Sequence, residues 1–328
     1  MPLLTRLTKL QIDELVKDYY QLGNVITVWK IKNGWSNTLF KIKTTHGDFF
    51  LKIYEEADLT QVMAEHEVVS SLVKNKFPTA SIIRTKTKEG IVNYEDKLVT
   101  IFNAIEGKPL VANPFKTVMG YRIVSILNVL HQTDTRSFIY LSKLNLAEHI
   151  EESLSWYLTN YTIGNLKDNL VNLFESFSGI SFFALTNGVV HNDLGIDNFL
   201  VEGNNIKGLI DFDQVAYGSV VNDLAKFFAR SINLNVYDIK DFIQDIVRFI
   251  KDYSKNNALN QVDLNVLVSL IVFQKILILI KIKKNIREGT LRSHLYNFEE
   301  YASMVEKEIE ILFRNYLLME HEVNRLLS

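Results

Sequence analysis

The segment from Val189 to Asp213 constrains the fold of this chain more than any other stretch. Two short apolar runs, at 199–201 and 206–210, flank the turn Glu202-Gly203-Asn204-Asn205. Strand-favouring residues on both sides of a Gly/Asn turn predict a β-hairpin. Because a hairpin folds back on itself, its two outer ends lie close together, and any side chains placed at those ends are brought to one place.

Polar side chains stand at both outer ends of this predicted hairpin. His191, Asp193 and Asn198 precede the first strand, and Asp211 follows the second. We therefore expect Asp193, Asn198 and Asp211 to converge on one point. Two carboxylates and an amide oxygen are hard ligands, of the kind that Mg²⁺ takes together with waters and substrate phosphates.

A phosphoryl-transfer site would use these residue types directly. The reaction needs charge neutralisation, alignment and an acceptor for the proton of the attacking hydroxyl group, more than covalent help. Asp193 is placed in the loop before Asn198 for the role of proton acceptor, which leaves Asn198 and Asp211 as metal ligands. The alternative is a polar turn in an ordinary domain, with acids that merely face water.

The same residues carry a family resemblance. The sequence H-N-D-L-G-I-D-N at 191–198, followed by I-D-F at 210–212, resembles the aminoglycoside phosphotransferase and choline kinase family. These are small-molecule kinases with a protein-kinase-like fold. Their usual loop is H-G-D-x-x-x-x-N, so Asn192 departs from the common Gly. The expected fold class is accordingly α+β and protein-kinase-like, with a small antiparallel-sheet N-lobe at 1–104 and a large, mainly helical C-lobe at 105–328.

The resemblance also implies roles for individual residues. Asp193 would be the catalytic base, Asn198 and Asp211 would bind magnesium, and His191 would brace the loop. The family further implies a downstream acid that holds the catalytic loop, and Asp223 matches it. The nearby acids Asp197 and Asp213 are expected either to support the site without binding the metal or to face water.

The N-terminal third predicts an antiparallel meander. Strand-favouring residues occupy 25–31, 38–44 and 48–54, with turns between them. In a kinase the first of these turns covers the nucleotide phosphates. The resemblance therefore assigns Ser36 and Asn37 to cofactor binding, although a plain hairpin turn is the alternative that this stretch alone leaves open.

Lys52 lies in the third of these strands. A lysine on an apolar strand ordinarily extends its ammonium group to water, whereas the resemblance implies that Lys52 binds the nucleotide phosphates. Such a lysine needs an acidic partner on the next helix, which should run from Asp58 or Thr60 to about Lys76. Glu65 is the first choice because it shares an apolar helix face, and Glu67 is the alternative.

Further strands at 82–85 and 97–102 should complete the first sheet, and a hinge between lobes should follow. There the resemblance assigns the backbone of Asn103 and Ala104 to the adenine edge. The pair Asn113-Pro114 predicts the start of a helix that runs to His131, which we expect to pack against the catalytic loop. Further helices are expected at about 146–161, 166–177, around 182 and 298–318.

Composition excludes several classes of partner. The chain has 328 residues, a net charge of −2 and no cysteine. We expect no nucleic-acid surface, no disulfide and a cytoplasmic location. The most apolar window, 266–280, is interrupted by Gln274 and Lys275 and is too short to cross a bilayer, so we expect no membrane partner and a buried helix. The basic cluster at 281–284 with Arg287 is expected to be a solvated helix end, with a phosphate or acidic-substrate contact as the alternative.

The resulting hypothesis is an ATP- and Mg²⁺-dependent kinase that phosphorylates a hydroxyl group of a small molecule, with GTP as an alternative donor. Aminoglycosides, choline or ethanolamine, homoserine and sugar-like alcohols stay open as acceptors, and a monomer or homodimer is expected. The short segment 212–222, which lacks A-P-E, disfavours the alternative of an atypical protein kinase. A non-catalytic nucleotide-binding protein should have lost Lys52, Asp193, Asn198 or Asp211, and all are present.

Overall fold

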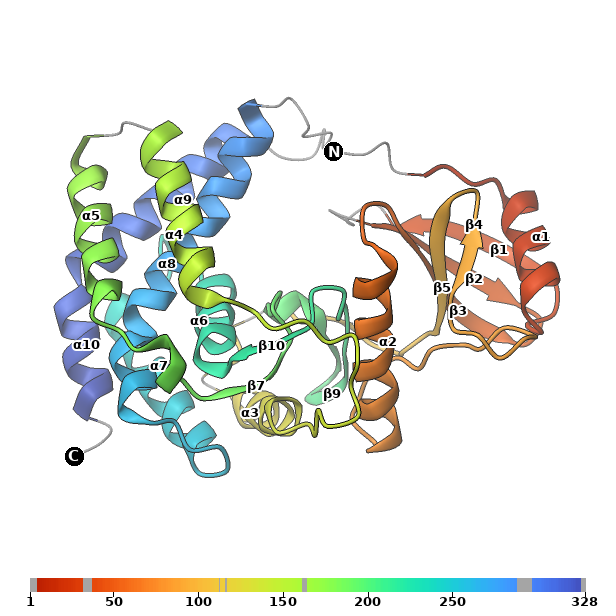
Figure 1. Ribbon diagram of the computed structural model, residues 1–328, viewed down its shortest axis with the longest axis horizontal. Coiled ribbons are helices and arrows are strands. Elements are labelled where there is room, and N and C mark those ends of the chain that lie inside the picture. The colour runs from red at the N-terminus through yellow and green to blue at the C-terminus, as the bar shows by residue number, and fades with distance from the viewer. Residues whose placement is uncertain are drawn as a thin grey trace. The chain divides into compact units, whose positions relative to one another are not determined.

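The structure is a computed structural model that describes residues 5–31, 37–111, 113–115, 117–160, 164–287 and 297–325 (Figure 1). The chain forms two compact units. The N-terminal unit comprises 1–108, 136–141 and 200–214, and the C-terminal unit comprises the rest. After residue 108 the chain thus returns to the N-terminal unit twice, so a single boundary in the sequence does not separate the two units.

An antiparallel sheet of five strands forms the N-terminal unit's scaffold. Its strand order is β1-β2-β3-β5-β4. The strands are β1 (Val25–Ile31), β2 (Thr38–Thr44), β3 (Gly47–Tyr54), β4 (Val92–Tyr94) and β5 (Lys97–Asn103). The predicted meander is therefore present, and β4 is an additional strand. The strand expected at 82–85 is wrong: Ile82 forms only an isolated bridge with Phe102, because the chain turns at Thr85, whose N–H donates to Glu89.

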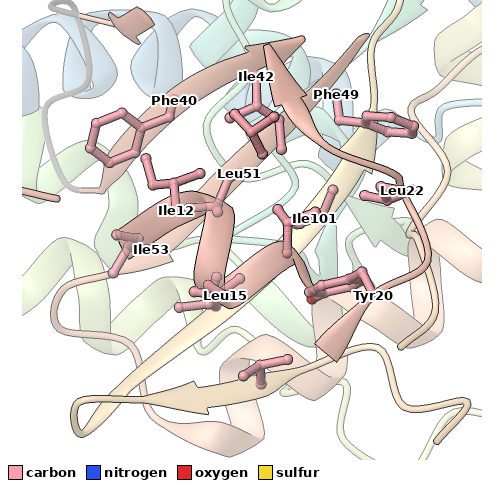
Figure 2. Close-up of a cluster of buried hydrophobic side chains, with 14 residues drawn as sticks. Ile12, Leu15, Tyr20, Leu22, Phe40, Ile42, Phe49, Leu51, Ile53 and Ile101 are labelled. Carbon is pink, nitrogen blue, oxygen red and sulfur yellow. The ribbon is translucent and has the colours of Figure 1, made fainter. Parts of the chain in front are cut away.

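The core of this unit lies between the sheet and α1 (Lys9–Tyr19) (Figure 2). Thr8 and Gln11 form the capping box that begins α1. Side chains alternate along a strand, so Leu51 enters this core while Lys52 points to the opposite face. Each fully buried aliphatic side chain contributes about 1.5–3 kcal/mol to folding. The buried set consists of Ile12, Leu15, Val16, Tyr20, Leu22, Val25, Phe40, Ile42, Phe49, Leu51, Ile53, Val92, Val99 and Ile101.

Two further elements bear on the predicted site: the helix that carries Glu65 and the hairpin that precedes Asp211. Helix α2 (Leu59–Lys74) begins at the N-cap Asp58, whose carboxylate accepts the Gln61 N–H. The predicted hairpin is confirmed as β8 (Phe199–Glu202) and β9 (Asn205–Leu209), in a sheet of order β6-β8-β9 with β6 (Lys108–Pro109). Gly203 adopts φ +57° in the turn, a conformation that costs glycine nothing.

The C-terminal unit is mainly helical (Figure 1). Its strands β7 (Asn187–Val190) and β10 (Ala216–Ser219) pair in antiparallel fashion. Its α-helices are α3 (Val118–His131), α4 (Leu146–Asn160), α5 (Gly164–Ser178), α6 (Val220–Ser231), α7 (Ile239–Ser254), α8 (Gln261–Arg287), α9 (Phe298–Arg314) and α10 (Tyr316–Asn324), and short 3₁₀ turns lie at Phe182–Ala184 and Ile196–Asn198.

Two predicted helix boundaries are wrong. Helix α3 begins at Val118 and not at Pro114, because Thr117 is the N-cap and accepts the Met119 N–H, while Asn113 caps only the N–H of Phe115. The last predicted helix is divided at Asn315, which ends α9 and precedes α10.

Helix α8 is longer than its apolar window suggested. It has 27 residues, and by length and composition it could cross a membrane, although 78% of its most apolar window is buried inside the protein. Its polar residues are satisfied there: Gln274 donates to Asn222, and Lys275 forms a buried ion pair with Glu308 at 3.0 Å. The basic residues that follow the window continue the helix instead of ending it. The pattern is that of a core helix of the C-terminal unit.

Candidate active site

A buried lysine organises the first group of predicted site residues, all within the N-terminal unit. Lys52 on β3 donates to both Glu65 oxygens, at 3.1 and 3.3 Å, and lies 3.3 Å from Asp211 Oδ1. Lys52 is 5% exposed and Glu65 2%. Tyr54, two residues along the same strand face, donates to Glu65 at 2.7 Å. The predicted ion pair between Lys52 and Glu65 is therefore present.

The charge state of Lys52 follows from its surroundings. Burial alone would lower the pKa of Lys52, but the charges of Glu65 and Asp213, together with Tyr54 and Asp211, outweigh it and hold that pKa well above its ordinary value. The ammonium group is thus fixed in its charged form beside carboxylates. Glu67, the alternative partner, points elsewhere and accepts the backbone N–H groups of residues 139 and 140.

Asp211 follows β9 with an unusual backbone conformation. Its φ is +71°, in the left-handed region that Asp and Asn adopt more readily than other non-glycine residues. Its side chain is 46% exposed while one oxygen contacts Lys52. Asp213, by contrast, is buried, accepts a hydrogen bond from Asn37 at 2.8 Å and lies 3.9 Å from Lys52. Of the two outcomes expected for Asp213, support of the site is the one observed.

The catalytic loop in the C-terminal unit is held by one buried acid. Asp223 on α6 is 1% exposed, and its two oxygens accept the backbone N–H groups of His191 at 2.8 Å and Asn192 at 2.9 Å. Asn192 has φ +60°. The family's common Gly adopts such a conformation without strain, and Asn tolerates it better than most residues do. The departure at Asn192 therefore preserves the loop conformation.

A buried chain of hydrogen bonds supports that acid in turn. His131 Nε2 lies 3.2 Å from Asp223, and His131 Nδ1 lies 2.6 Å from the Tyr253 hydroxyl group. Burial alone would raise the pKa of Asp223, but the hydrogen bond from His131 and the charges of His131 and His191 lower it below its ordinary value. Asp223 is therefore an anion at neutral pH, which strengthens its hold on the loop N–H groups.

Asp193 and Asn198 are joined through the loop backbone. Asn198 Nδ2 donates to the Asp193 carbonyl oxygen at 2.9 Å. This hydrogen bond orients the amide of the buried Asn198, so that its Oδ1 points away from that carbonyl. An amide oxygen fixed in this way, and a half-exposed carboxylate at Asp211, are suitable donors for a cation that also keeps waters and phosphate oxygens. Each of these two oxygen donors is thus of a kind that a magnesium ion accepts.

Arg230 is a site residue that the sequence analysis missed. Its Nη1 donates to Asp193 Oδ1 at 2.5 Å and to the Asp193 carbonyl oxygen at 2.8 Å, while Nη2 contacts Asp197 at 3.2 Å. The signal was the helical spacing, because Arg230 lies one heptad after Asp223 on α6 and shares its face. Arg230 therefore fixes the orientation of the carboxylate expected to accept the proton.

The remaining predicted residues have mixed outcomes. Ser36 lies outside the described residues. Asn37 is described and also accepts the Glu55 N–H. The N–H of Asn103 donates to Ser81, and the N–H of Ala104 donates to Asp48. Binding of adenine by this segment stays a prediction.

The structure brings the predicted residues together as two sets. Lys52, Glu65 and Asp211 meet in the N-terminal unit, and Asp193 and Asn198 meet in the C-terminal unit. Convergence of these two sets on one metal stays a prediction. Within the described segments, no group of three or more His, Cys, Asp or Glu side chains could hold a metal. The predicted magnesium site has only two protein ligands, the Asn198 amide oxygen and the Asp211 carboxylate, so it is not a group of this kind.

Comparisons with known proteins identify the class of this fold. The computed structure is similar to amicoumacin kinase hAmiN, solved with AMP-PNP and Ca²⁺, with a TM-score of 0.66 and 17% identity over 87% of this chain and 88% of that one. It is also similar to a choline/ethanolamine kinase family protein from Mesorhizobium loti, with a TM-score of 0.65 and 14% identity over 92% and 93% of the two chains. The fold is therefore the protein-kinase-like α+β fold of small-molecule phosphotransferases.

The sequence defines the family. A model described as the phosphotransferase enzyme family matches residues 27–254, and the chain belongs to this family. The homoserine kinase of Methylobacillus flagellatus is 20% identical over 236 residues, which cover 69% of this chain and 69% of that protein. The resemblance to aminoglycoside phosphotransferases and choline kinases is thus confirmed.

Proposed function

We propose that this protein is an ATP- and Mg²⁺-dependent kinase that transfers the γ-phosphoryl group to a hydroxyl group of a small molecule. The observation that carries the proposal is the cluster around Lys52, which is buried, charged, paired with Glu65 and within 3.3 Å of the exposed Asp211 carboxylate. A fixed ammonium group beside a carboxylate with an open side suits a nucleotide phosphate and its metal. A purely structural ion pair would not require the half-exposed acid.

Each residue has a separate task in this proposal. Lys52 binds nucleotide phosphate oxygens, and Glu65 and Tyr54 keep its ammonium group in place. Asn198 and Asp211 would hold the magnesium ion, which when bound would neutralise charge on the phosphates. Asp193 accepts the proton of the attacking hydroxyl group, and Arg230 keeps its carboxylate oriented. Asp223 holds the loop backbone, which keeps Asp193 and Asn198 in position.

The relatives support the choice of donor and acceptor. The amicoumacin kinase was solved with an ATP analogue and a divalent cation, which supports ATP, with GTP as the alternative donor. The relatives named homoserine kinase and amicoumacin kinase support a small hydroxyl-bearing acceptor. The short segment between Asp211 and Asp223 supports a small molecule over a peptide. The absence of cysteine and the net charge of −2 support a cytoplasmic enzyme without nucleic-acid or membrane partners. A monomer or homodimer is part of the proposal.

A two-stage experiment tests the proposal. Thermal-shift measurements with ATP or GTP, each with and without Mg²⁺, should show stabilisation that requires both nucleotide and metal. Incubation of the same protein with ATP, Mg²⁺ and a panel of small alcohols should then give a phosphorylated product, and Asp193→Asn should form it about 10²–10⁴-fold more slowly. Metal-independent nucleotide binding without transfer to any alcohol would favour the non-catalytic alternative.

A further inference from the structure

The amide of Asn37 joins two segments that are far apart in the sequence. Its Nδ2 donates to Asp213 Oδ2 at 2.8 Å, and its Oδ1 accepts the backbone N–H of Glu55 at 3.3 Å. Asn37 directly precedes β2, Glu55 directly follows β3, and Asp213 lies two residues after Asp211. All of these residues belong to the N-terminal unit. The amide therefore ties the sheet to the segment that carries a proposed metal ligand.

The segment 210–213 depends on such contacts for its position. It belongs to no helix or strand, so the hydrogen-bond ladder of β9 does not hold it. Asp211 adopts φ +71° there and keeps a half-exposed side chain. Gln61 Nε2 donates to the Asp213 carbonyl oxygen at 3.0 Å, which holds the backbone. The bond from Asn37 acts on the Asp213 carboxylate itself.

The sheet end of this connection is held by several hydrogen bonds. Glu55 is buried, and its carboxylate accepts the Thr38 hydroxyl group at 2.5 Å and the Thr5 N–H at 2.6 Å. Lys97 lies 3.4 Å from the same carboxylate. Burial alone would raise the pKa of Glu55, but these hydrogen bonds lower it below its ordinary value. Asn37 is thus bonded to the backbone of a residue that is itself fixed.

The same contacts disfavour direct binding of the nucleotide by Asn37. Both polar atoms of its side chain have protein partners, and one partner is a carboxylate. A phosphate oxygen at Nδ2 would face Asp213, and like charges repel. The charge of Lys52 offsets such repulsion, whereas a neutral amide does not. Lys52 lies 3.9 Å from the Asp213 oxygen that Asn37 binds, so this bond keeps the carboxylate beside the ammonium group.

We propose that Asn37 is a positioning residue that acts through Asp213 to hold the Asp211 carboxylate beside Lys52, and that its side chain does not bind the nucleotide. This role replaces the cofactor contact that the family resemblance implies for Asn37. It rests on the proposed function, because a metal ligand has to be held to within about half an ångström of its working position.

Two kinds of variant test this role. Asn37→Ala removes the amide without changing any charge. The exchanged pair, Asn37→Asp combined with Asp213→Asn, keeps a donor opposite an acceptor, keeps the total charge and can still accept the Glu55 N–H. The quantity to measure by calorimetry is the Mg²⁺ enhancement, defined as the Kd for AMP-PNP without Mg²⁺ divided by the Kd with Mg²⁺.

The two roles predict different changes in this ratio. For a positioning residue, Asn37→Ala should lower the Mg²⁺ enhancement about tenfold and change the Kd without Mg²⁺ less than about threefold. The exchanged pair should keep the enhancement within about threefold of wild type. A general loosening of the site would weaken both affinities alike. Asn93→Ala, at an exposed position of β4, is the matched control and should keep the wild-type ratio.

Several results would overturn the positioning role and leave the kinase intact. One is a loss of affinity in Asn37→Ala that is equal with and without Mg²⁺, as expected for a phosphate ligand. Another is an unchanged enhancement in Asn37→Ala, and a third is its loss in the exchanged pair. If Asn37→Ala does not fold, the exchanged pair decides, because a phosphate ligand would not tolerate a carboxylate at position 37.

Failure of the proposed function would look different. In that case AMP-PNP binding to the wild-type protein would not respond to Mg²⁺. Thermal unfolding of the nucleotide-free variants then decides on the bond between Asn37 and Asp213. A midpoint that falls in Asn37→Ala and is restored in the exchanged pair supports the bond as the fastening of this segment. An unchanged midpoint, or one that the exchanged pair does not restore, overturns it.

Discussion

The N-terminal and C-terminal units hold their site residues in different ways. Around Lys52 the contacts are between full charges, with Glu65 buried and Asp211 half exposed. Around Asp193 the loop is held mainly through its backbone, by N–H groups that donate to Asp223 and by Asn198. The first arrangement depends on contacts between charges, whereas the second combines backbone hydrogen bonds with the ion pair between Asp193 and Arg230. The same kind of substitution should therefore have different consequences in the two units.

The largest effect is expected at Asp211. Asp211→Asn removes the charge but keeps a residue that tolerates φ +71°. Loss of a metal-binding carboxylate should lower kcat/KM by about 10³-fold or more and weaken nucleotide binding in the presence of Mg²⁺. Isothermal calorimetry and steady-state kinetics would measure both. Unchanged Mg²⁺-nucleotide affinity would mean that Asp211 is not a metal ligand.

The same Asp-to-Asn change in the C-terminal unit should lower turnover while leaving nucleotide binding almost unchanged. Asp193→Asn should lower kcat by about 10²–10⁴-fold, because it removes the proton acceptor. Nucleotide affinity should stay within about twofold of wild type, since Asp193 binds neither phosphate nor metal in the proposed reaction. Equal losses of nucleotide affinity in Asp193→Asn and Asp211→Asn would contradict the different roles proposed for these two residues.

A smaller effect should follow from the partner of Lys52. Glu65→Gln weakens the buried ion pair while Lys52 keeps Asp211 and Asp213 nearby. We expect kcat/KM to fall about 10- to 100-fold, mostly through a higher KM for ATP, as a positioning role predicts. Glu67→Gln is the control, because that side chain contacts backbone N–H groups and not Lys52. A larger loss in the control than in Glu65→Gln would contradict the assignment.

The smallest effect concerns the stability of the protein at acidic pH, through His66 on the same helix as Glu65. Burial, with the charges of Arg84 and Lys52, lowers the pKa of His66 from 6.5 to about 4. The unfolded chain therefore binds a proton that the folded chain does not between these values. Stability from neutral His66 is complete above about pH 6.5 and is lost as the pH falls toward 4, by about 3 kcal/mol at most.

Urea unfolding at several pH values would measure this contribution. His66→Gln can keep a hydrogen bond to Thr100 and should flatten the loss of stability over that range. His46→Gln, an exposed position, is the control and should follow the wild-type curve. A wild-type slope in His66→Gln would show that other groups cause the loss.

The local sequence pattern predicted the helices and strands better than it predicted which parts of the chain contact one another. The meander, the hairpin and the pairing of Lys52 with Glu65 follow from alternation and helical spacing, which short stretches of sequence express. The helix start at Thr117 was missed because Asn113-Pro114 and Thr117 are both acceptable caps, and only the tertiary structure selects between them.

The contacts of Arg230 depend on where α6 meets the catalytic loop. No local pattern encodes that placement, although its spacing from Asp223 shows that the two share a helix face. Residue types and the family resemblance together supplied the roles of Asp193, Asn198 and Asp211, and these roles stay predictions.

The return of residues 200–214 to the N-terminal unit has a consequence for dissecting the protein. A fragment ending at Lys108 would contain the sheet, Lys52 and Glu65 but neither Asp211 nor Asp213. The buried Lys52 ammonium group would lose two of its three carboxylate neighbours. We therefore expect this fragment to be less stable than the N-terminal unit of the full chain. Neither unit is a contiguous piece of the gene, and exchanging one between homologues would require cuts at several separate positions.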